Sequence, residues 1–237
     1  MTTRDWIALG VSFAYASSLL VLAEVIRHWR GYPQDFTRKI VHVGAGMWIL
    51  GVLALFDTWS IGLIGFGSFI VINYILWRYK VLDAVDAPDS TPGTVYFALS
   101  ITILLGLLWR KGLPGDMGYV AAAGTMAMTW GDSMAAILGK RFGRHRYTVL
   151  GGTRSWEGSA VMLVASFVSM FLILTLVPGS TLGPTARPLS VGTAFIAALV
   201  GAVVASVAEG LSPHGADNLS VPLLTGATVF IVVTALA

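Results

Sequence analysis

Residues 158–177, GSAVMLVASFVSMFLILTLV, form an uninterrupted apolar segment without a single charged side chain. An apolar segment of about 20 residues is long enough to cross the hydrocarbon core of a bilayer as an α-helix. Similar runs recur along the 237 residues, of which only 11% are charged, whereas a soluble domain carries about 25%. Because a backbone in lipid must form its own hydrogen bonds, the sequence predicts an all-α, polytopic transmembrane helical bundle.

The other apolar runs, taken outward from this segment, predict about eight spans in a single integral membrane domain covering residues 1–237. We expect no separate soluble domain. The last span is the weakest because it contains Pro222, and proline disrupts helix interiors. The expected spans are 6–26, 40–56, 58–77, 94–109, 117–139, 158–177, 190–208 and 219–236.

The loops differ in their content of Lys and Arg, which predicts the orientation of the chain. With the N-terminus outside, the inside loops hold eleven basic residues and the outside segments hold four. We therefore expect the inside loops to face the cytoplasm, or its equivalent in an organelle, and we favour a prokaryotic plasma membrane. The net charge of +3 comes from residues beside spans, so we expect no nucleic-acid partner. Because the chain lacks cysteine, disulfides, thiolate metal sites and cysteine nucleophiles are excluded.

The polar motifs are concentrated in three inside segments, 27–42, 139–159 and 209–222, and in the span that leads into the second of them. That span carries Asp132 about two turns from its inner end. A carboxylate at such a depth is costly unless it is paired, metal-bound or hydrated, which makes Asp132 a candidate functional residue. The alternative is a packing role, with a polar partner on a neighbouring span.

Cations and glycines follow Asp132 closely. Glycines allow close approach of the backbone, and exposed N–H groups together with Lys and Arg bind anions. The positive-inside rule alone would also place basic residues here, but the Ser155 and Glu157 that follow favour an anion site. Glu157 either compensates the dipole of the helix it begins or joins Asp132 in holding Mg²⁺. The glycines and cations concerned are Gly139, Lys140, Arg141, Gly143 and Arg154.

A second cluster lies in TRKIVHVGAG, residues 37–46. Arg38, Lys39 and His42 are three or four residues apart, so their side chains can face the same way. His42 lies just within a span, where it could orient or deprotonate a hydroxyl. A core histidine satisfied by one hydrogen bond explains the position equally well.

A third cluster, EGLSPHGADNLSVP, occupies residues 209–222. It brings Glu209, His214, Asp217 and Asn218 into an inside loop that has neither Lys nor Arg. Oxygen ligands for a metal ion would explain this composition. Asp217 could instead cap the final helix.

Several nucleotide-binding and hydrolase motifs are missing from the sequence. It contains no GxxxxGK[ST], because Arg141 follows Gly139-Lys140, and no HRD…DFG set, HExxH or GxSxG. Nucleotide chemistry in this chain would therefore use neither a P-loop nor a protein-kinase fold.

The clusters together resemble the motifs of the polyprenol and phytol kinases, a family that includes dolichol kinase and CTP-dependent diacylglycerol kinases. The resemblance covers about residues 37–225 and rests on the order, spacing and shared side of the motifs. The matching positions are Arg38-Lys39-x-x-His42, Gly131-Asp132-Ser133-x-Ala135, Gly139-Lys140-Arg141-Phe142-Gly143, Arg154-Ser155-Trp156-Glu157-Gly158-Ser159, Glu209 and Asp217-Asn218-Leu219-x-Val221-Pro222. Arg154 departs from the Lys that many members carry, which keeps the charge but changes the geometry.

This resemblance implies an enzyme that transfers a phosphoryl group, usually from CTP, to the hydroxyl of a membrane lipid alcohol. It also implies a divalent metal cofactor, Mg²⁺ or another divalent cation. An isoprenoid alcohol such as phytol or a polyprenol is favoured, with diacylglycerol as the alternative. The expected metal ligands are Asp132, Glu157, Glu209, Asp217 and Asn218, and the general base is His42 or one of the carboxylates Asp132, Glu157 and Asp217. The expected nucleotide-binding residues are Arg38, Lys39, Gly139, Lys140, Arg141, Gly143, Arg154 and Ser155.

Two rival functions follow from the same residues. Phosphatidate cytidylyltransferases share a similar (Lys/Arg)-(Ser/Thr)-Trp-Glu-Gly segment, but their C-terminal signature is absent from this chain. An ion-coupled transporter would use Asp132 and Glu209 as ion sites, and inverted repeats would be expected for it. The sequence shows no such repeat.

Overall fold

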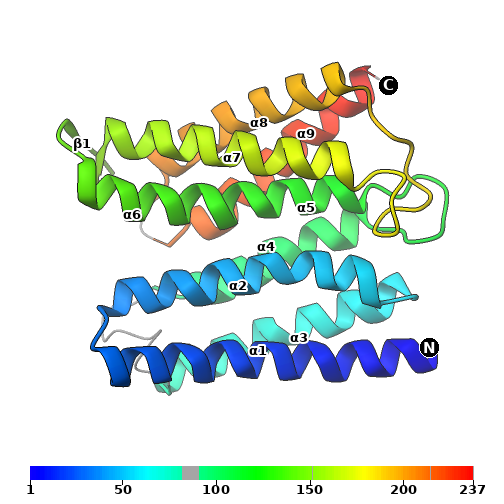
Figure 1. Ribbon diagram of the computed structural model, residues 1–237, viewed down its shortest axis with the longest axis horizontal. Coiled ribbons are helices and arrows are strands. Elements are labelled where there is room, and N and C mark those ends of the chain that lie inside the picture. Colours follow the sequence, from blue (N-terminus) through cyan, green and yellow to red (C-terminus); the bar gives the residue numbers. More distant parts are fainter. Residues whose placement is uncertain (82–90, 151, 214, 237) are drawn as a thin grey trace.

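The computed structural model describes residues 1–81, 91–150, 152–213 and 215–236. It is an up-and-down bundle of long helices with a short β-hairpin at one end (Figure 1). Much of the connector 79–93, and His214 of the third cluster, lie outside the described residues. The elements are α1 (Thr3–Arg30), α2 (Gln34–Leu55), α3 (Trp59–Tyr79), α4 (Gly93–Leu108), α5 (Gly118–Met126), η1 (Ala127–Asp132), α6 (Ser133–Phe142), β1 (Arg146–Val149), β2 (Gly152–Ser155), α7 (Trp156–Leu176), α8 (Val191–Leu211) and α9 (Asp217–Leu236).

Each of the eight expected spans corresponds to a helical rod within the described residues, if α5, η1 and α6 are counted as one rod. Six helices in this part of the chain, α1, α2, α3, α7, α8 and α9, are long and apolar enough to cross a membrane. α4 is apolar but has only 16 residues. The prediction of an all-α, polytopic membrane bundle is confirmed, and the orientation of the bundle stays a prediction.

The motif-bearing turns all lie at one end of the bundle. The hairpin, the α1–α2 turn and the α8–α9 turn are on the left in Figure 1, and both chain termini are on the right. We call the hairpin end the inner end and the opposite end the outer end, following the orientation predicted from the basic residues. α9 runs through Pro222 without a break, so the weakest of the expected spans is a continuous helix.

Side-chain caps explain where several helices begin. Thr2 and Asp5 form a reciprocal capping box at the start of α1, which satisfies backbone N–H groups that the helix leaves free. The Ser155 hydroxyl accepts the Gly158 N–H at the start of α7, and Ser190 plays the same part for α8. Ser155 therefore fixes the point at which the hairpin becomes a membrane helix.

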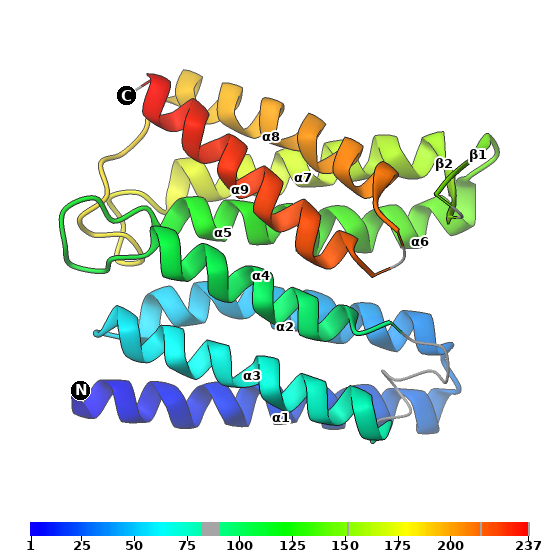
Figure 2. The ribbon, with the colours of Figure 1, turned by 180° about the vertical axis from the view of Figure 1, so that it is seen from behind.

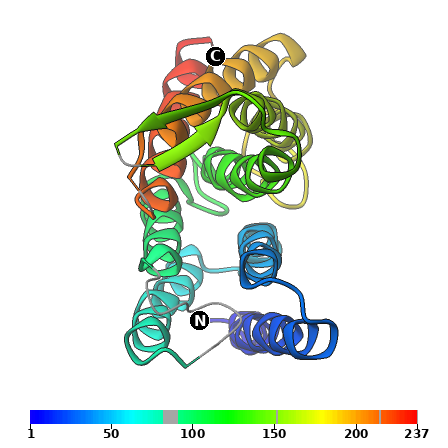
Figure 3. The same cartoon turned by 90° about the vertical axis from the view of Figure 1, so that its left-hand side faces the viewer.

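The helices form two groups that meet along α2 and α4. Figure 3, which looks along the bundle, shows α1–α4 in the lower part and α5–α9 in the upper part. α1 packs along α2, α3 packs along α4, and α8 packs against both α7 and α9. α4 also contacts α9, as the rear view shows (Figure 2). The N-terminal helices are thereby held against the rod that carries Asp132.

The middle of that rod, η1, is a π-helix, a rare form that occurs mostly as a single turn within α-helices and often at functional sites. The Ser166 hydroxyl on α7 donates to the Ala127 carbonyl at 3.0 Å. Glycines let both neighbours approach η1 closely, because a Cβ at Gly46 on α2 would lie 2.0 Å from the Thr129 hydroxyl. A Cβ at Gly131 would lie 2.2 Å from the Ser166 hydroxyl. The turn that ends at Asp132 is thus clamped between α2 and α7.

The segment 140–157 contains regular structure that the sequence pattern does not predict. β1 and β2 pair antiparallel, with Arg146 opposite Ser155 and Val149 opposite Gly152. The pattern indicates only a Gly- and Arg-rich connection, because each strand has just four residues. The two strands that carry Arg146 and Arg154 lie at the inner end of the bundle (Figure 1).

Replacing Gly124 by Ala should destabilise the bundle. A Cβ at Gly124 would lie 2.8 Å from the Pro222 carbonyl oxygen and 3.0 Å from the Gly226 Cα, and neither backbone atom can rotate away. We expect the free energy of unfolding to fall by about 1–3 kcal/mol, measured by thermal unfolding in detergent. Gly10→Ala is the matched control, because a Cβ there meets nothing within 4 Å. Equal stability of the two variants would contradict this packing.

Candidate active site

A pocket of about 1110 Å³ opens at the inner end, between the two groups of helices. Its inner part is lined by five cations and four carboxylates, and its deeper part is lined mainly by apolar side chains of α1–α4. The cations are Arg38, Lys39, Lys140, Arg146 and Arg154, and the carboxylates are Asp35, Asp132, Glu209 and Asp217. The pocket therefore joins a strongly charged region to an apolar one.

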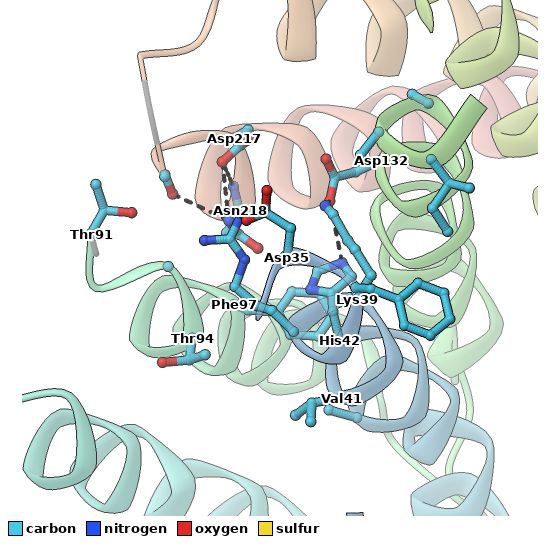
Figure 4. Close-up of a pocket in the computed structure, with 18 of the residues that line it drawn as sticks. Asp35, Lys39, Val41, His42, Thr91, Thr94, Phe97, Asp132, Asp217 and Asn218 are labelled. Atoms are coloured by element: carbon cyan, nitrogen blue, oxygen red, sulfur yellow. Dashed lines mark hydrogen bonds and ion pairs between the residues drawn. The ribbon is translucent and has the colours of Figure 1, made fainter. Parts of the chain in front are cut away.

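Asp132, Lys39 and His42 meet at the centre of the charged region (Figure 4). The Lys39 ammonium group forms an ion pair with the Asp132 carboxylate, and the His42 Nε2 lies 3.8 Å from the same oxygen. All three side chains are at most 15% exposed. Asp132 is thus paired across helices, as its depth in a span requires, and Lys39 and His42 face one way as their spacing predicts.

Two further contacts hold the His42 ring in place. Its Nε2 lies 3.4 Å from the carbonyl oxygen of Met128 in the π-helix. Its ring packs on Phe97 of α4 with a centroid distance of 4.4 Å. The imidazole is thereby fixed at the border between the charged and the apolar parts of the pocket.

Arg154 and Glu209 form a second buried ion pair. The Arg154 Nε donates to the Glu209 carboxylate at 2.6 Å, and the Nη2 donates to the Ser212 carbonyl at 2.8 Å. Both side chains are largely buried, with exposed fractions of 15% for Arg154 and 14% for Glu209. The guanidinium group connects β2 to the end of α8, so the second and third sequence clusters meet through it.

Asp217 and Asn218 begin α9 and face the same pocket (Figure 4). The Asp217 carboxylate accepts bonds from the backbone N–H of Asn218 at 2.9 Å and from its side-chain amide at 3.0 Å. Among the described residues, no cation pairs with Asp217. This carboxylate therefore keeps acceptor capacity for a ligand that brings positive charge.

The rim of the pocket carries more exposed charges. Asp35, which no sequence motif marks, forms ion pairs with both Lys140 and Arg38. Arg146 also lines the pocket, and it makes no ion pair with any described residue. Its place in a basic, glycine-rich segment is the signal that could have marked it.

Not every expected site residue reaches the pocket. The Glu157 carboxylate accepts from His145 Nδ1 at 2.7 Å and lies away from the pocket lining. Arg141 is exposed beside the Phe142 ring, and Gly143 is also absent from the lining. The structure therefore brings Asp132, Glu209 and Asp217 to one pocket without Glu157.

Gly139 and Gly143 have a packing role in this structure. A Cβ at Gly139 would lie 3.1 Å from the Gly158 Cα, and one at Gly143 would lie 2.5 Å from the Ser155 hydroxyl. The glycines thus let α6 cross the first turn of α7 closely. Gly139 and Ser155 also line the pocket, so close crossing and site formation involve the same residues.

The donor set fits a cation that arrives together with phosphate. Among the described residues, no three His, Cys, Asp or Glu side chains are close enough to hold a metal ion by themselves. Mg²⁺ is commonly bound by one or two carboxylates plus substrate phosphates and water, so a preformed cage is not required. Asp132 and Asp217, facing one pocket beside several cations, are suited to such shared coordination.

Comparison with known proteins gives consistent relatives. The chain is 35% identical to a phytol kinase from Synechocystis sp., over 92% of this chain and 88% of that protein. It is 25% identical to a probable chloroplastic phytol kinase from Triticum aestivum, over 98% of this chain and 78% of that protein. It is 33% identical to a dolichol kinase from Schizosaccharomyces pombe, over 65% of this chain and 27% of that protein. No family model and no solved structure matches the chain.

Proposed function

Since this chain belongs to the family of polyprenol, phytol and dolichol kinases and is a lipid-alcohol kinase, we propose that it transfers the γ-phosphate of CTP to the hydroxyl of a membrane isoprenoid alcohol. Phytol or a related polyprenol is the acceptor that we favour. We place the reaction at the cytoplasmic face of a prokaryotic plasma membrane, because the inside loops carry eleven of the fifteen Lys and Arg residues.

The observation that carries this proposal is the continuity of the pocket. Cations suited to a triphosphate and an apolar space suited to a lipid tail lie in the same cavity. Asp132 and His42 lie where the two parts meet, so an alcohol with its tail in the apolar part would present its hydroxyl beside them. A soluble phosphate acceptor would leave the apolar part without a role.

The cations have a defined task in such a reaction. Phosphoryl transfer depends mainly on positioning and on neutralising the charge of the transferred group. We assign this task to Lys39, Lys140 and Arg154, together with Arg146, which pairs with no carboxylate in the described part of the chain, and with Arg38 at the rim. Lys39 and Arg154 are held by carboxylates in the free protein, so the phosphates would compete with Asp132 and Glu209 for them.

The carboxylates would bind the metal ion, and His42 or a carboxylate would accept the proton of the alcohol. A divalent cation bound with the nucleotide would neutralise phosphate charge, and we assign Asp132 and Asp217 as its protein ligands, supported by Asn218 and Glu209. His42 or Asp132 would accept the proton of the alcohol while the alcohol oxygen bonds to the γ-phosphorus and the bond from that phosphorus to the CDP oxygen breaks. The surrounding apolar helices keep water scarce, which limits hydrolysis of CTP.

A comparison of donors tests this proposal. Purified protein in lipid would be given phytol and Mg²⁺ with γ-labelled CTP, ATP, GTP or UTP in separate reactions. We expect labelled phytyl phosphate to form fastest from CTP, and excess EDTA to stop its formation. A preference for ATP would contradict the assigned donor, and absence of transfer from all four nucleotides would contradict the assigned activity.

A further inference from the structure

The apolar part of the pocket is a chamber between the hairpins α1–α2 and α3–α4, and it is shallow (Figure 3). Along α2 its lining extends outward from His42 to Trp48, which is six residues further on. Six residues of helix correspond to about 9 Å at a rise of about 1.5 Å per residue. One leaflet of hydrocarbon is about 15 Å thick, half of the whole core. An extended lipid tail of that length therefore leaves the chamber between two of its helices.

Three of the four seams between these helices are closed. Between α1 and α2, a Cβ at Gly44 would lie 2.6 Å from the Leu19 side chain. Between α3 and α4, the Asn73 side-chain amide donates to the Thr94 carbonyl at 3.1 Å. The seam between α2 and α4 faces α5, which contacts both helices. The seam between α1 and α3 is the remaining route, and it lies on the side away from α5–α9 (Figure 3).

The contacts that join α1 to α3 lie in the outer halves of the two helices. At the outer end, the Asp5 carboxylate accepts from the Thr58 backbone N–H at 3.0 Å and from its hydroxyl at 2.8 Å. Further in, the Phe13 and Phe69 rings meet with a centroid distance of 5.3 Å. Inward of these rings, both helices line the pocket. The lining residues there, which we call the inner seam, are Ala16, Ser17 and Leu20 on α1 and Ile72, Asn73 and Leu76 on α3.

The wall formed by α1 is more exposed than the walls formed by α2 and α4. Val41 on α2 and Phe97 on α4 line the pocket and are only 9% and 5% exposed. Phe13, which also lines it, is 40% exposed, and Ser17 is exposed too. The inner seam lies within α1 and α3, both long and apolar enough to span the membrane. It therefore borders lipid tails, which are as apolar as a leucine side chain.

We propose that the inner seam is a lateral opening through which the tail of the lipid alcohol extends from the chamber into the inner leaflet. This inference rests on the proposed kinase function. Only the hydroxyl end of the alcohol enters the chamber and reaches Asp132 and His42, while most of the tail keeps its contacts with membrane lipid. The alcohol can then enter, and its phosphate can leave, by diffusion within the leaflet.

A bulky side chain at the inner seam tests the opening. Ser17 lines the pocket, whereas its neighbour Ser18 is exposed on the same helix and does not line it. We expect Ser17→Trp to raise the KM for phytol about tenfold without changing the KM for CTP, because only binding of the lipid is obstructed. Ser18→Trp is the matched control and should keep both values. Transfer from γ-labelled CTP would be measured in lipid vesicles at varied phytol concentrations.

The outcomes separate the opening from the proposed function. Equal KM values for phytol in the two variants would overturn the opening and leave the kinase function intact. A rise in the KM for both substrates in Ser17→Trp would also contradict it, because an obstructed lipid route does not affect the nucleotide. If the unaltered protein phosphorylated no alcohol, the proposed function itself would be wrong.

A photoreactive alcohol gives a test that does not depend on turnover. Phytol with a diazirine at the far end of its tail would be irradiated with the protein in lipid, with and without excess phytol, and adducts would be located by mass spectrometry. We expect the adducts that phytol suppresses on Val21 and Ile75, which are 62% and 47% exposed and do not line the pocket. Suppressed adducts on Trp48 or Phe66, which line the chamber, would show that the tail ends inside it. Such a result, or no suppressed adduct at all, would contradict the opening.

Discussion

Asp132→Asn is expected to abolish phosphoryl transfer while the protein still inserts into the membrane, with a lower thermal stability because the buried Lys39 ammonium group loses its partner. The substitution keeps the shape of the side chain but removes the charge that pairs with Lys39 and that we assign to the metal. Groups that stabilise charge in a transition state are worth about a hundredfold in rate. Labelled phytyl phosphate would be measured with the variant at saturating CTP and Mg²⁺, beside its thermal unfolding in detergent.

Asp57→Asn is the matched control for this variant. Asp57 is at the outer end, where its 36%-exposed side chain forms an ion pair with Arg4 and does not line the pocket. It should keep the rate of the unaltered protein. If Asp132→Asn kept more than about a tenth of that rate, the carboxylate would supply less than about 1.4 kcal/mol to the transition state. Its assignment to the metal would then be wrong.

Arg154→Met should lose both activity and stability. The substitution leaves the Glu209 carboxylate buried without its cation, and breaking one side of a buried ion pair costs about 3–5 kcal/mol. It also removes a cation that we assign to the triphosphate, so the rate should fall about a hundredfold. Both quantities can be measured on the same preparation, by thermal unfolding and by transfer from γ-labelled CTP.

A double variant separates the two effects. Arg154→Met combined with Glu209→Gln no longer contains an unpaired buried charge, so most of the stability should return while the activity stays low. Arg154→Lys keeps the charge but loses the bond to either Glu209 or the Ser212 carbonyl. Its rate should lie between the rate of the unaltered protein and the rate of Arg154→Met. Recovery of full activity in the double variant would show that Arg154 acts only as a partner of Glu209.

The spans could be predicted from composition because a bilayer requires long apolar helices. The π-helix could not, because Ala127 to Asp132 follow the same apolar pattern as the rest of their rod. Its cause is tertiary, since α7 and α2 supply the donors and the close contacts around it. The hairpin of β1 and β2 could not be predicted either, because strands of four residues are too short to give a recognisable alternating pattern.

The candidate site was predictable where depth or spacing constrained a side chain. Asp132 in a span needed a partner, and Lys39 and His42 lie on the face that provides it. The role of Glu157 was ambiguous, because its position in the first turn of α7 does not show whether the carboxylate faces the pocket or His145. The apolar part of the pocket gave no signal, because lining residues such as Phe13 and Phe69 are ordinary apolar residues of membrane-spanning helices.

The central claim, that this chain is a lipid-alcohol kinase, is tested most directly by following two phosphorus atoms of CTP. Purified protein in lipid with Mg²⁺ would receive γ-labelled or α-labelled CTP in parallel, with phytol and phosphatidate both present. We predict that label reaches phytol from the γ position only and that phosphatidate stays unlabelled. Label reaching phosphatidate from the α position would identify a cytidylyltransferase and contradict the account.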